Sequence, residues 1–189
     1  MRLLLPGVCM LAGCIVDPFI HYERPVRAEF GMNTRHFRSD PTVPTTARVT
    51  SSPTPKDIDG SAASVALRFM MRMRWTTYMG AEAEAGTFLG REGSNLAGAY
   101  AVFGATAPFR PGTIAAEIAG GWRGMRDRVG VPDHDVTIIE PRVRGELWLG
   151  DQFTLGATAG AELTSQHSWM AGIYLGVHSH TRDLPTPNR

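Results

Sequence analysis

The chain has 189 residues, with 19 basic and 18 acidic residues and a formal net charge of +1. This length allows one domain with extensions, and the near balance of charge provides no bulk attraction to nucleic acid. The two cysteines, Cys9 and Cys14, both lie near the start, so the rest of the chain has no disulfide framework. No apolar run approaches the roughly 20 residues that a membrane-spanning helix needs.

The first residues have the features of a bacterial signal peptide. Arg2 gives a positive start, the apolar stretch LLLPGVCM follows, and Leu11–Cys14 reads LAGC. This tetrad resembles the lipobox of bacterial lipoproteins, in which the cysteine is diacylated and becomes the new N-terminus. We therefore predict a signal peptide over residues 1–13, lipidation at Cys14 and a periplasmic linker over 14–25. An ordinary secretory signal is the alternative.

In the region that follows, only one short segment alternates in polarity like a strand. It is VRAEFGM, Val26–Met32, which would place its apolar residues on one face and Arg27 and Glu29 on the other. The segment after it contains SDPTVPTTARVTSSPTPKD and is rich in Pro, Ser and Thr. Residues 33–63 are therefore expected to form one long loop or linker.

Strand-length segments of alternating polarity then follow one another as far as residue 180. Stretches such as GREGSN, APFRPG and RVGVPDHD separate them, which is typical of consecutive antiparallel hairpins. Seven other strands are predicted, and single-chain bacterial barrels have even strand numbers. Val26–Met32 is therefore needed as an eighth strand. Closing the sheet into a barrel would remove its exposed edges. We predict a barrel body over 64–180 and a C-terminal tail over 181–189. Within the body, the other predicted strands are 64–76, 78–88, 96–107, 112–124, 136–149, 153–164 and 168–180.

One face of these strands is apolar, and the other carries charge of both signs. In VALRFMMRMRW, Val65–Trp75, every odd position is apolar, and three of the five even positions are Arg. An apolar exterior around a polar interior is typical of membrane barrels, and about eight strands leave an interior that side chains fill. Buried charges are tolerable when they are paired. The expected interior ion-pair lattice consists of Arg68, Arg72, Arg74, Glu82, Glu84, Glu117, Arg123, Glu140, Arg142, Arg144, Glu146 and Glu162.

Large aromatic residues are expected to form two bands near the ends of the strands, where lipid meets water. The predicted bands contain Trp75, Tyr78, Phe109 and Phe153 at one end and Phe88, Trp122 and Trp169 at the other.

With this pattern, from about Gly60 to His180, the chain resembles the small outer-membrane barrels of the OmpA/OmpX type. The resemblance implies an all-β fold, an eight-stranded antiparallel up-and-down barrel with a polar filled interior and no large channel. It also implies a place in the outer membrane of a Gram-negative bacterium, where Cys14 would add a lipid anchor. The long link RVGVPDHD indicates the extracellular end, and GDQ indicates the periplasmic end.

We accordingly predict a barrel that is not an enzyme and has a structural or surface-interaction role, with membrane lipid as its only identified partner and no cofactor. An alternative is a periplasmic lipoprotein with a soluble, lipocalin-like barrel, whose apolar face turns inward around an apolar ligand.

Three pairs of residues are candidates for catalysis or metal binding. A lipid-modifying enzyme could use His167 and Ser168, but adjacent residues of a strand point to opposite faces. His178 and His180 share a strand face and would need a third ligand to hold a transition metal, and we predict no metal site. Asp133 and Asp135 in a hairpin loop could contact a hard cation, although acidic residues are common in loops.

Overall fold

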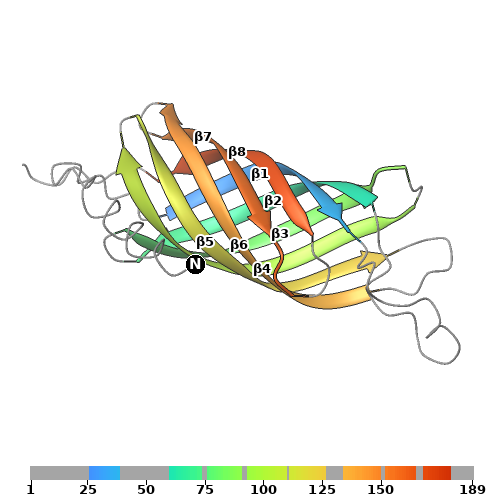
Figure 1. Ribbon diagram of the computed structural model, residues 1–189. Coiled ribbons are helices and arrows are strands. Elements are labelled where there is room, and N and C mark those ends of the chain that lie inside the picture. Colours follow the sequence, from blue (N-terminus) through green and yellow to red (C-terminus); the bar gives the residue numbers. More distant parts are fainter. Residues whose placement is uncertain are drawn as a thin grey trace, which may run out of the picture.

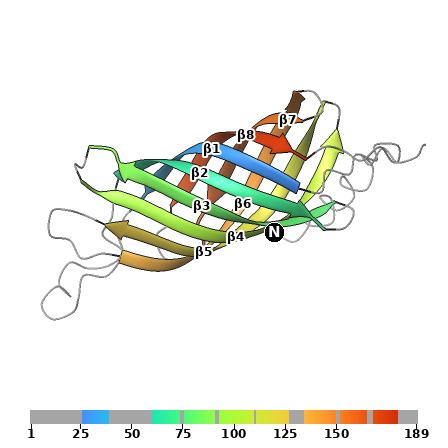
Figure 2. The ribbon, with the colours of Figure 1, turned by 180° about the vertical axis from the view of Figure 1, so that it is seen from behind.

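The chain folds into a closed β-barrel (Figures 1 and 2). The computed structural model describes residues 26–38, 60–73, 76–90, 93–109, 111–126, 134–149, 152–164 and 168–179. Within these ranges the elements are β1 Val26–Phe37, β2 Gly60–Arg72, β3 Thr77–Phe88, β4 Asn95–Phe109, β5 Gly112–Arg126, β6 His134–Leu149, β7 Phe153–Ala161 and β8 Trp169–His178.

Each strand pairs antiparallel with the next one in the chain, and β8 pairs with β1 to close the barrel. This arrangement confirms the predicted all-β, eight-stranded up-and-down barrel. None of the described segments is a helix long and apolar enough to cross a membrane.

The first hairpin is longer than the sequence predicted. β1 continues past Met32 to Phe37, and β2 begins at Gly60, so residues 33–37 and 60–63 are strand rather than loop. The two extensions pair with each other in the register that ends at Phe37 and Gly60. The prediction was wrong here because polar residues take the outward positions, Thr34 exposed and His36 half-buried, so the apolar alternation fades. The other strands fall on the predicted segments with small shifts at their ends.

The connections define two ends of the barrel, which we call the long-connection end and the short-connection end. Residues 38–59, 89–94, 127–133 and 162–168 join strands at the long-connection end. Residues 73–76, 110–111 and 150–152 join strands at the short-connection end, where β1 begins and β8 ends. In the link between β3 and β4, Gly90 and Gly93 have φ angles of 76° and 80°, which glycine adopts readily because it lacks a Cβ.

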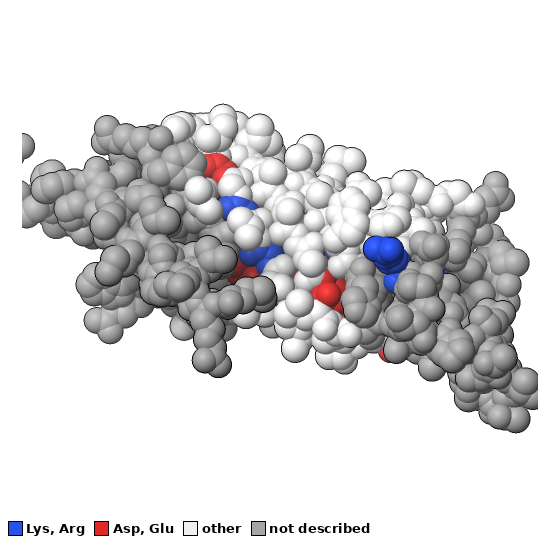
Figure 3. Space-filling view, viewed as in Figure 1, with Lys and Arg blue, Asp and Glu red and all other residues white. Residues whose placement is uncertain are grey.

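The exterior of the barrel is apolar. Phe69 on β2 and Ile173 on β8 are 56% and 60% exposed. On the face shown in Figure 3, uncharged residues cover most of the described surface between the two ends. The soluble lipocalin-like alternative required these side chains to face inward, and it is wrong on this point. We call the following residues the apolar belt: Phe30, Met32, Val65, Leu67, Phe69, Met71, Met79, Phe103, Ile114, Ile118, Trp122, Ile139, Val143, Leu147, Leu149, Phe153, Leu155, Trp169, Ile173, Leu175 and Val177.

Candidate functional site

Charged side chains from several strands meet in the centre of the barrel. Glu140 on β6 accepts hydrogen bonds from Arg35 Nη1 at 2.5 Å, Arg142 Nε at 2.6 Å and Arg123 Nη2 at 3.1 Å. Arg35, Arg123 and Glu140 have no exposed surface. Charge-assisted hydrogen bonds of this kind are roughly twice as strong as neutral ones, and here one carboxylate serves three guanidinium groups.

A neighbouring cluster is built around Glu82 and Glu117. Arg68 donates from Nε to Glu82 at 2.8 Å and from Nη1 to Glu117 at 3.0 Å. Arg142 Nη1 also donates to Glu82 at 2.8 Å. Because Arg142 contacts both Glu82 and Glu140, the two clusters form one network, the ion-pair lattice.

Hydroxyl groups complete the lattice on the β2–β4 side. Glu84 accepts from Arg35 Nε at 2.8 Å, from the Ser64 hydroxyl at 2.5 Å and from the Tyr100 hydroxyl at 2.9 Å. The Tyr100 oxygen in turn accepts from Arg123 Nε at 3.1 Å. Tyr100 therefore bridges Glu84 and Arg123, which the ion pairs of Arg35 and Glu140 also connect.

At the long-connection end, the last carboxylate of the lattice is that of Glu162. Its carboxylate accepts from Arg123 Nη1 and from the Ser168 hydroxyl, both at 2.8 Å. Ser168 is only 1% exposed, so its hydroxyl lies in the interior rather than on the lipid-facing surface that the enzyme alternative needs. His167, the other residue of that alternative, lies outside the described residues.

The structure brings most of the predicted lattice residues together, and two are exceptions. Arg72 is exposed at the short-connection end, and Arg74 lies outside the described residues. The others are buried or nearly buried inside the barrel: Arg68, Glu82, Glu84, Glu117, Arg123, Glu140, Arg142, Arg144, Glu146 and Glu162.

Sequence reasoning missed Arg35 and the interior tyrosines Tyr78 and Tyr100. Arg35 was assigned to a loop, although its odd number continues the parity of Arg27 and Glu29, which do face inward as predicted. The predicted aromatic bands are wrong for Tyr78, whose hydroxyl donates to Glu117 at 2.6 Å.

The predicted aromatic bands are also wrong for Phe88, which packs against Phe37 with the ring centroids 5.4 Å apart. Phe153, Trp122 and Trp169 do face outward. Trp75 and the side chain of Phe109 are outside the described part of the chain.

In the part of the chain that the structure describes, no group of three or more His, Cys, Asp or Glu side chains could hold a metal ion. His178 is buried, and its Nε2 lies 3.2 Å from Thr154 Oγ1. Asp135 is exposed at the start of β6. His180 and Asp133 are outside the described ranges.

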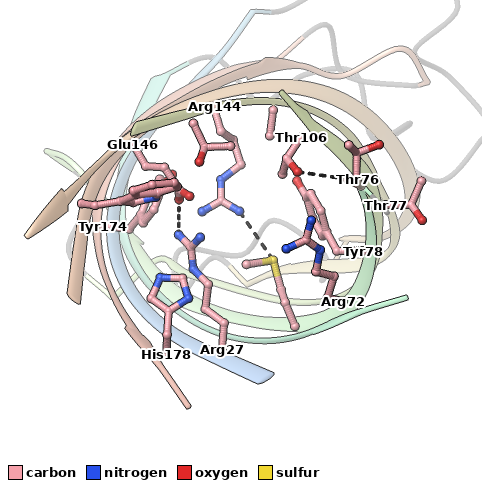
Figure 4. A pocket seen from close by; sticks show the side chains of 14 residues that line it. Arg27, Arg72, Thr76, Thr77, Tyr78, Thr106, Arg144, Glu146, Tyr174 and His178 are labelled. Atoms are coloured by element: carbon pink, nitrogen blue, oxygen red, sulfur yellow. Dashed lines mark hydrogen bonds and ion pairs between the residues drawn. The ribbon is translucent and has the colours of Figure 1, made fainter. Parts of the chain in front are cut away.

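A pocket of about 120 Å³ opens at the short-connection end, and we call it the mouth pocket (Figure 4). Arg144 crosses its floor, donates from Nη2 to both oxygens of Glu29 at 2.7 and 2.6 Å, and stacks on Tyr174 with Cζ 4.1 Å from the ring centroid. Arg27 pairs with Glu29 and Glu146.

Deeper in the barrel the side chains leave much less space. The cavity that Arg68, Glu82 and Arg142 help to line is about 20 Å³, which is room for about one water molecule. The described interior is therefore filled, and it leaves no wide channel at this depth.

Comparison by sequence gives no relatives: no family model matches the chain, and no curated protein does. Comparison with solved structures does find matches. Neisserial surface protein A from Neisseria aligns with a TM-score of 0.55 at 10% identity, covering 82% of this chain and 96% of that one.

The N-terminal β-barrel domain of Pseudomonas aeruginosa OprF aligns with a TM-score of 0.51 at 10% identity over 81% and 97% of the two chains. Ail, the attachment invasion locus protein of Yersinia pestis, gives 0.52 at 7% identity over 82% and 97%. The chain therefore has the fold of these small barrels, as its resemblance to the OmpA/OmpX type predicted.

Proposed function

We propose that this chain is an integral β-barrel of the outer membrane of a Gram-negative bacterium, with a structural or surface-interaction role and no wide pore. The apolar belt carries this proposal. Soluble monomers rarely expose contiguous apolar patches larger than a few hundred Å², whereas this belt includes residues of all eight strands. Lipid chains covering the belt would remove that surface from water.

The strand lengths suit a bilayer. A tilted transmembrane strand needs about 9–11 residues, and the shortest strand, β7, has 9. Ile173 lies in the middle of β8 and faces outward among residues of the belt, whereas polar Asp135 and Thr137 face outward at the long-connection end. This distribution fits a hydrocarbon zone with water beyond it.

The side chains of the ion-pair lattice fill the interior of the barrel. Its buried charges would be costly if left unpaired, and the contacts of Glu140, Glu82 and Glu84 pair them across strands. A filled interior favours a role for the exterior and the connections over transport through the lumen.

In this proposal the short-connection end faces the periplasm, and Cys14 carries the lipid anchor. β1 begins at that end, at Val26. The 12 residues of the segment 14–25 could span about 40 Å when extended, which is ample to reach the neighbouring leaflet.

The test is fractionation of cells that express the wild-type protein or Cys14→Ala. We expect the variant to remain with the outer membrane and to be extracted only by detergent, because the belt holds the barrel in lipid without acyl chains. Full release of the variant into the soluble periplasm would refute the membrane barrel. Metabolic labelling with radioactive palmitate tests the anchor separately: the wild type should be labelled and Cys14→Ala should not, and equal labelling would rule out Cys14 as the site.

A further inference from the structure

At the long-connection end, β6 extends further than its neighbour β7. The pairing of β6 with β5 continues to His134, and the two strands form one hairpin there (Figure 1). The pairing of β6 with β7 begins only at Arg142, and beyond it the Leu163 N–H donates to the Ile139 carbonyl at 3.0 Å. In the ranges that the structure describes, residues 134–138 therefore have β5 on one side and no strand on the other. We call these five residues the open edge.

The backbone groups of Asp135 and Thr137 point away from β5. In an antiparallel strand the N–H and C=O of one residue share an edge, and those of the next residue take the opposite edge. Even-numbered residues of β6 face β5, since the Trp148 N–H donates to the Pro111 carbonyl at 3.0 Å, whereas Ile139 faces the other way. By this alternation, the N–H and C=O groups of Asp135 and Thr137 lie on the side where no described strand pairs with them. Such a row of backbone groups can pair with another chain.

The open edge is held in an extended conformation. Val136 and Ile138 point into the barrel and are 8% and 0% exposed, whereas Asp135 and Thr137 point outward and are exposed. β-Branched residues favour strands. The usual protections of an edge are lysine, proline or a bulge, and residues 134–138 have none of them. A preorganised edge of this kind binds an added strand at a low cost in conformational entropy.

A second copy of the chain does not suit this edge. Two copies in one membrane have the same orientation, but antiparallel pairing of two identical edges relates the copies by a two-fold axis perpendicular to the sheet. This axis would turn one copy upside down in the bilayer. Parallel pairing by translation would need the opposite edge of β6, which β5 occupies. An extended segment of another protein meets neither restriction, and addition of a strand to an exposed edge is a recurring mode of peptide recognition.

The side chains of the open edge indicate the chemistry of the added segment. On the outward face, one of its residues would lie opposite Asp135 and another opposite Thr137, and the residue between them would lie beside Val136. Opposite charges across neighbouring strands stabilise a pair, so a basic residue suits the position opposite Asp135. β-Branched residues suit the other positions.

From these observations we propose that the open edge binds an extended peptide segment of another protein as an added antiparallel strand, with a lysine or arginine opposite Asp135. This inference deepens the surface-interaction role proposed above. It rests on that proposal for the side of the membrane, because a periplasmic short-connection end places the open edge outside the cell.

Amide hydrogen exchange of the full-chain protein in detergent, followed by nuclear magnetic resonance, tests the edge without a ligand. The amides of Val136 and Ile138 face β5 and should exchange slowly, whereas those of Asp135 and Thr137 should exchange at least about tenfold faster. Equally slow exchange at all four amides would show that another part of the chain covers the edge, and would overturn the proposal.

The probe for binding is the peptide Thr-Val-Arg-Val-Thr with blocked ends, added to the same protein. We expect saturable binding at one site, with the Thr137 amide protected from exchange in the complex. Replacement of the peptide's arginine by glutamate places like charges opposite each other at Asp135 and should weaken binding by about fivefold. Methylation of the arginine's backbone nitrogen removes a donor to the edge and should abolish binding.

Two substitutions at Thr137 separate backbone pairing from side-chain contact. Thr137→Pro removes the N–H on the open side and leaves the bonds to β5 in place, so it should abolish binding. Thr137→Val keeps the N–H and the branched shape and should change binding by less than about twofold. Asp135→Lys should reverse the preference, so that the glutamate peptide binds more tightly than the arginine peptide. Unboiled samples on a denaturing gel show whether each variant keeps its folded barrel.

The proposal is overturned if the arginine peptide shows no saturable binding, if the methylated peptide binds as tightly, or if a folded Thr137→Pro protein binds as Thr137→Val does. Each of these results leaves the membrane barrel standing when the protein fractionates with the outer membrane. Release of Cys14→Ala into the periplasm, together with peptide binding that Thr137→Pro abolishes, would refute the membrane barrel and confirm the edge site.

Discussion

Glu140→Gln removes the carboxylate that Arg35, Arg123 and Arg142 share, at 2.5, 3.1 and 2.6 Å. The glutamine oxygen can still accept from these groups, but the amide nitrogen then faces guanidinium donors that it cannot bind. At least one charge-assisted hydrogen bond is lost, at about 1.5–3 kcal/mol, and a positive charge remains uncompensated where no water reaches. Removal of one partner of a buried ion pair costs about 3–5 kcal/mol, and we expect a loss of free energy of unfolding in that range.

The assay is equilibrium unfolding by guanidinium chloride in lipid vesicles, followed by tryptophan fluorescence. Asp135→Asn on the same strand is the control, since Asp135 is exposed, and it should change the free energy of unfolding by less than about 0.5 kcal/mol. The double variant Arg35→Gln/Glu140→Gln should cost less than the sum of the two single variants, by about 0.5–3 kcal/mol. A loss below about 1 kcal/mol for Glu140→Gln would refute the reasoning that the lattice stabilises the barrel.

Two further predictions use the same assay. Ile173→Arg places a charge in the middle of the apolar belt and should cost about 2–4 kcal/mol in lipid; a cost no larger than that of Ile173→Ala would contradict contact with hydrocarbon. Gly156→Ala should cost about 1–3 kcal/mol, because its Cβ would lie 2.2 Å from Cζ and 2.3 Å from the hydroxyl of Tyr174, whereas a Cβ at Gly145 meets nothing within 4 Å. Gly145→Ala is therefore the control, and equal losses for the two alanines would disprove the packing around Tyr174.

The fold could be predicted because one physical pattern runs through most of the chain. Successive strand residues point to opposite faces, so Leu67 and Phe69 face outward while Arg68 faces inward, as the alternation indicated. The pattern failed where the outward-facing residues are no longer apolar. Beyond Met32 the outward residues of β1 are polar, and the alternation that revealed the earlier part of the strand is lost.

The composition of the lattice could be predicted more completely than its pairing. Arg35 and Glu140 are 105 residues apart in the chain and meet only because closure and strand tilt bring β1 and β6 across the interior from each other. The alternation along each strand predicts which side chains face the lumen, but it does not predict their positions along the barrel axis. The same holds for Tyr100, whose aromatic ring suggested no particular face until Glu84 and Arg123 were seen beside its hydroxyl.

The central claim is that the odd-numbered residues of β8 contact lipid. The most direct measurement is electron paramagnetic resonance of a spin label at Ile173→Cys, in a protein in which Cys9 and Cys14 are replaced by Ala, reconstituted into vesicles. The label should be relaxed strongly by oxygen, which concentrates in hydrocarbon, and hardly at all by a water-soluble nickel chelate, whereas a label at Asp135→Cys should respond to the chelate. Strong relaxation of the Ile173→Cys label by the chelate would contradict the account.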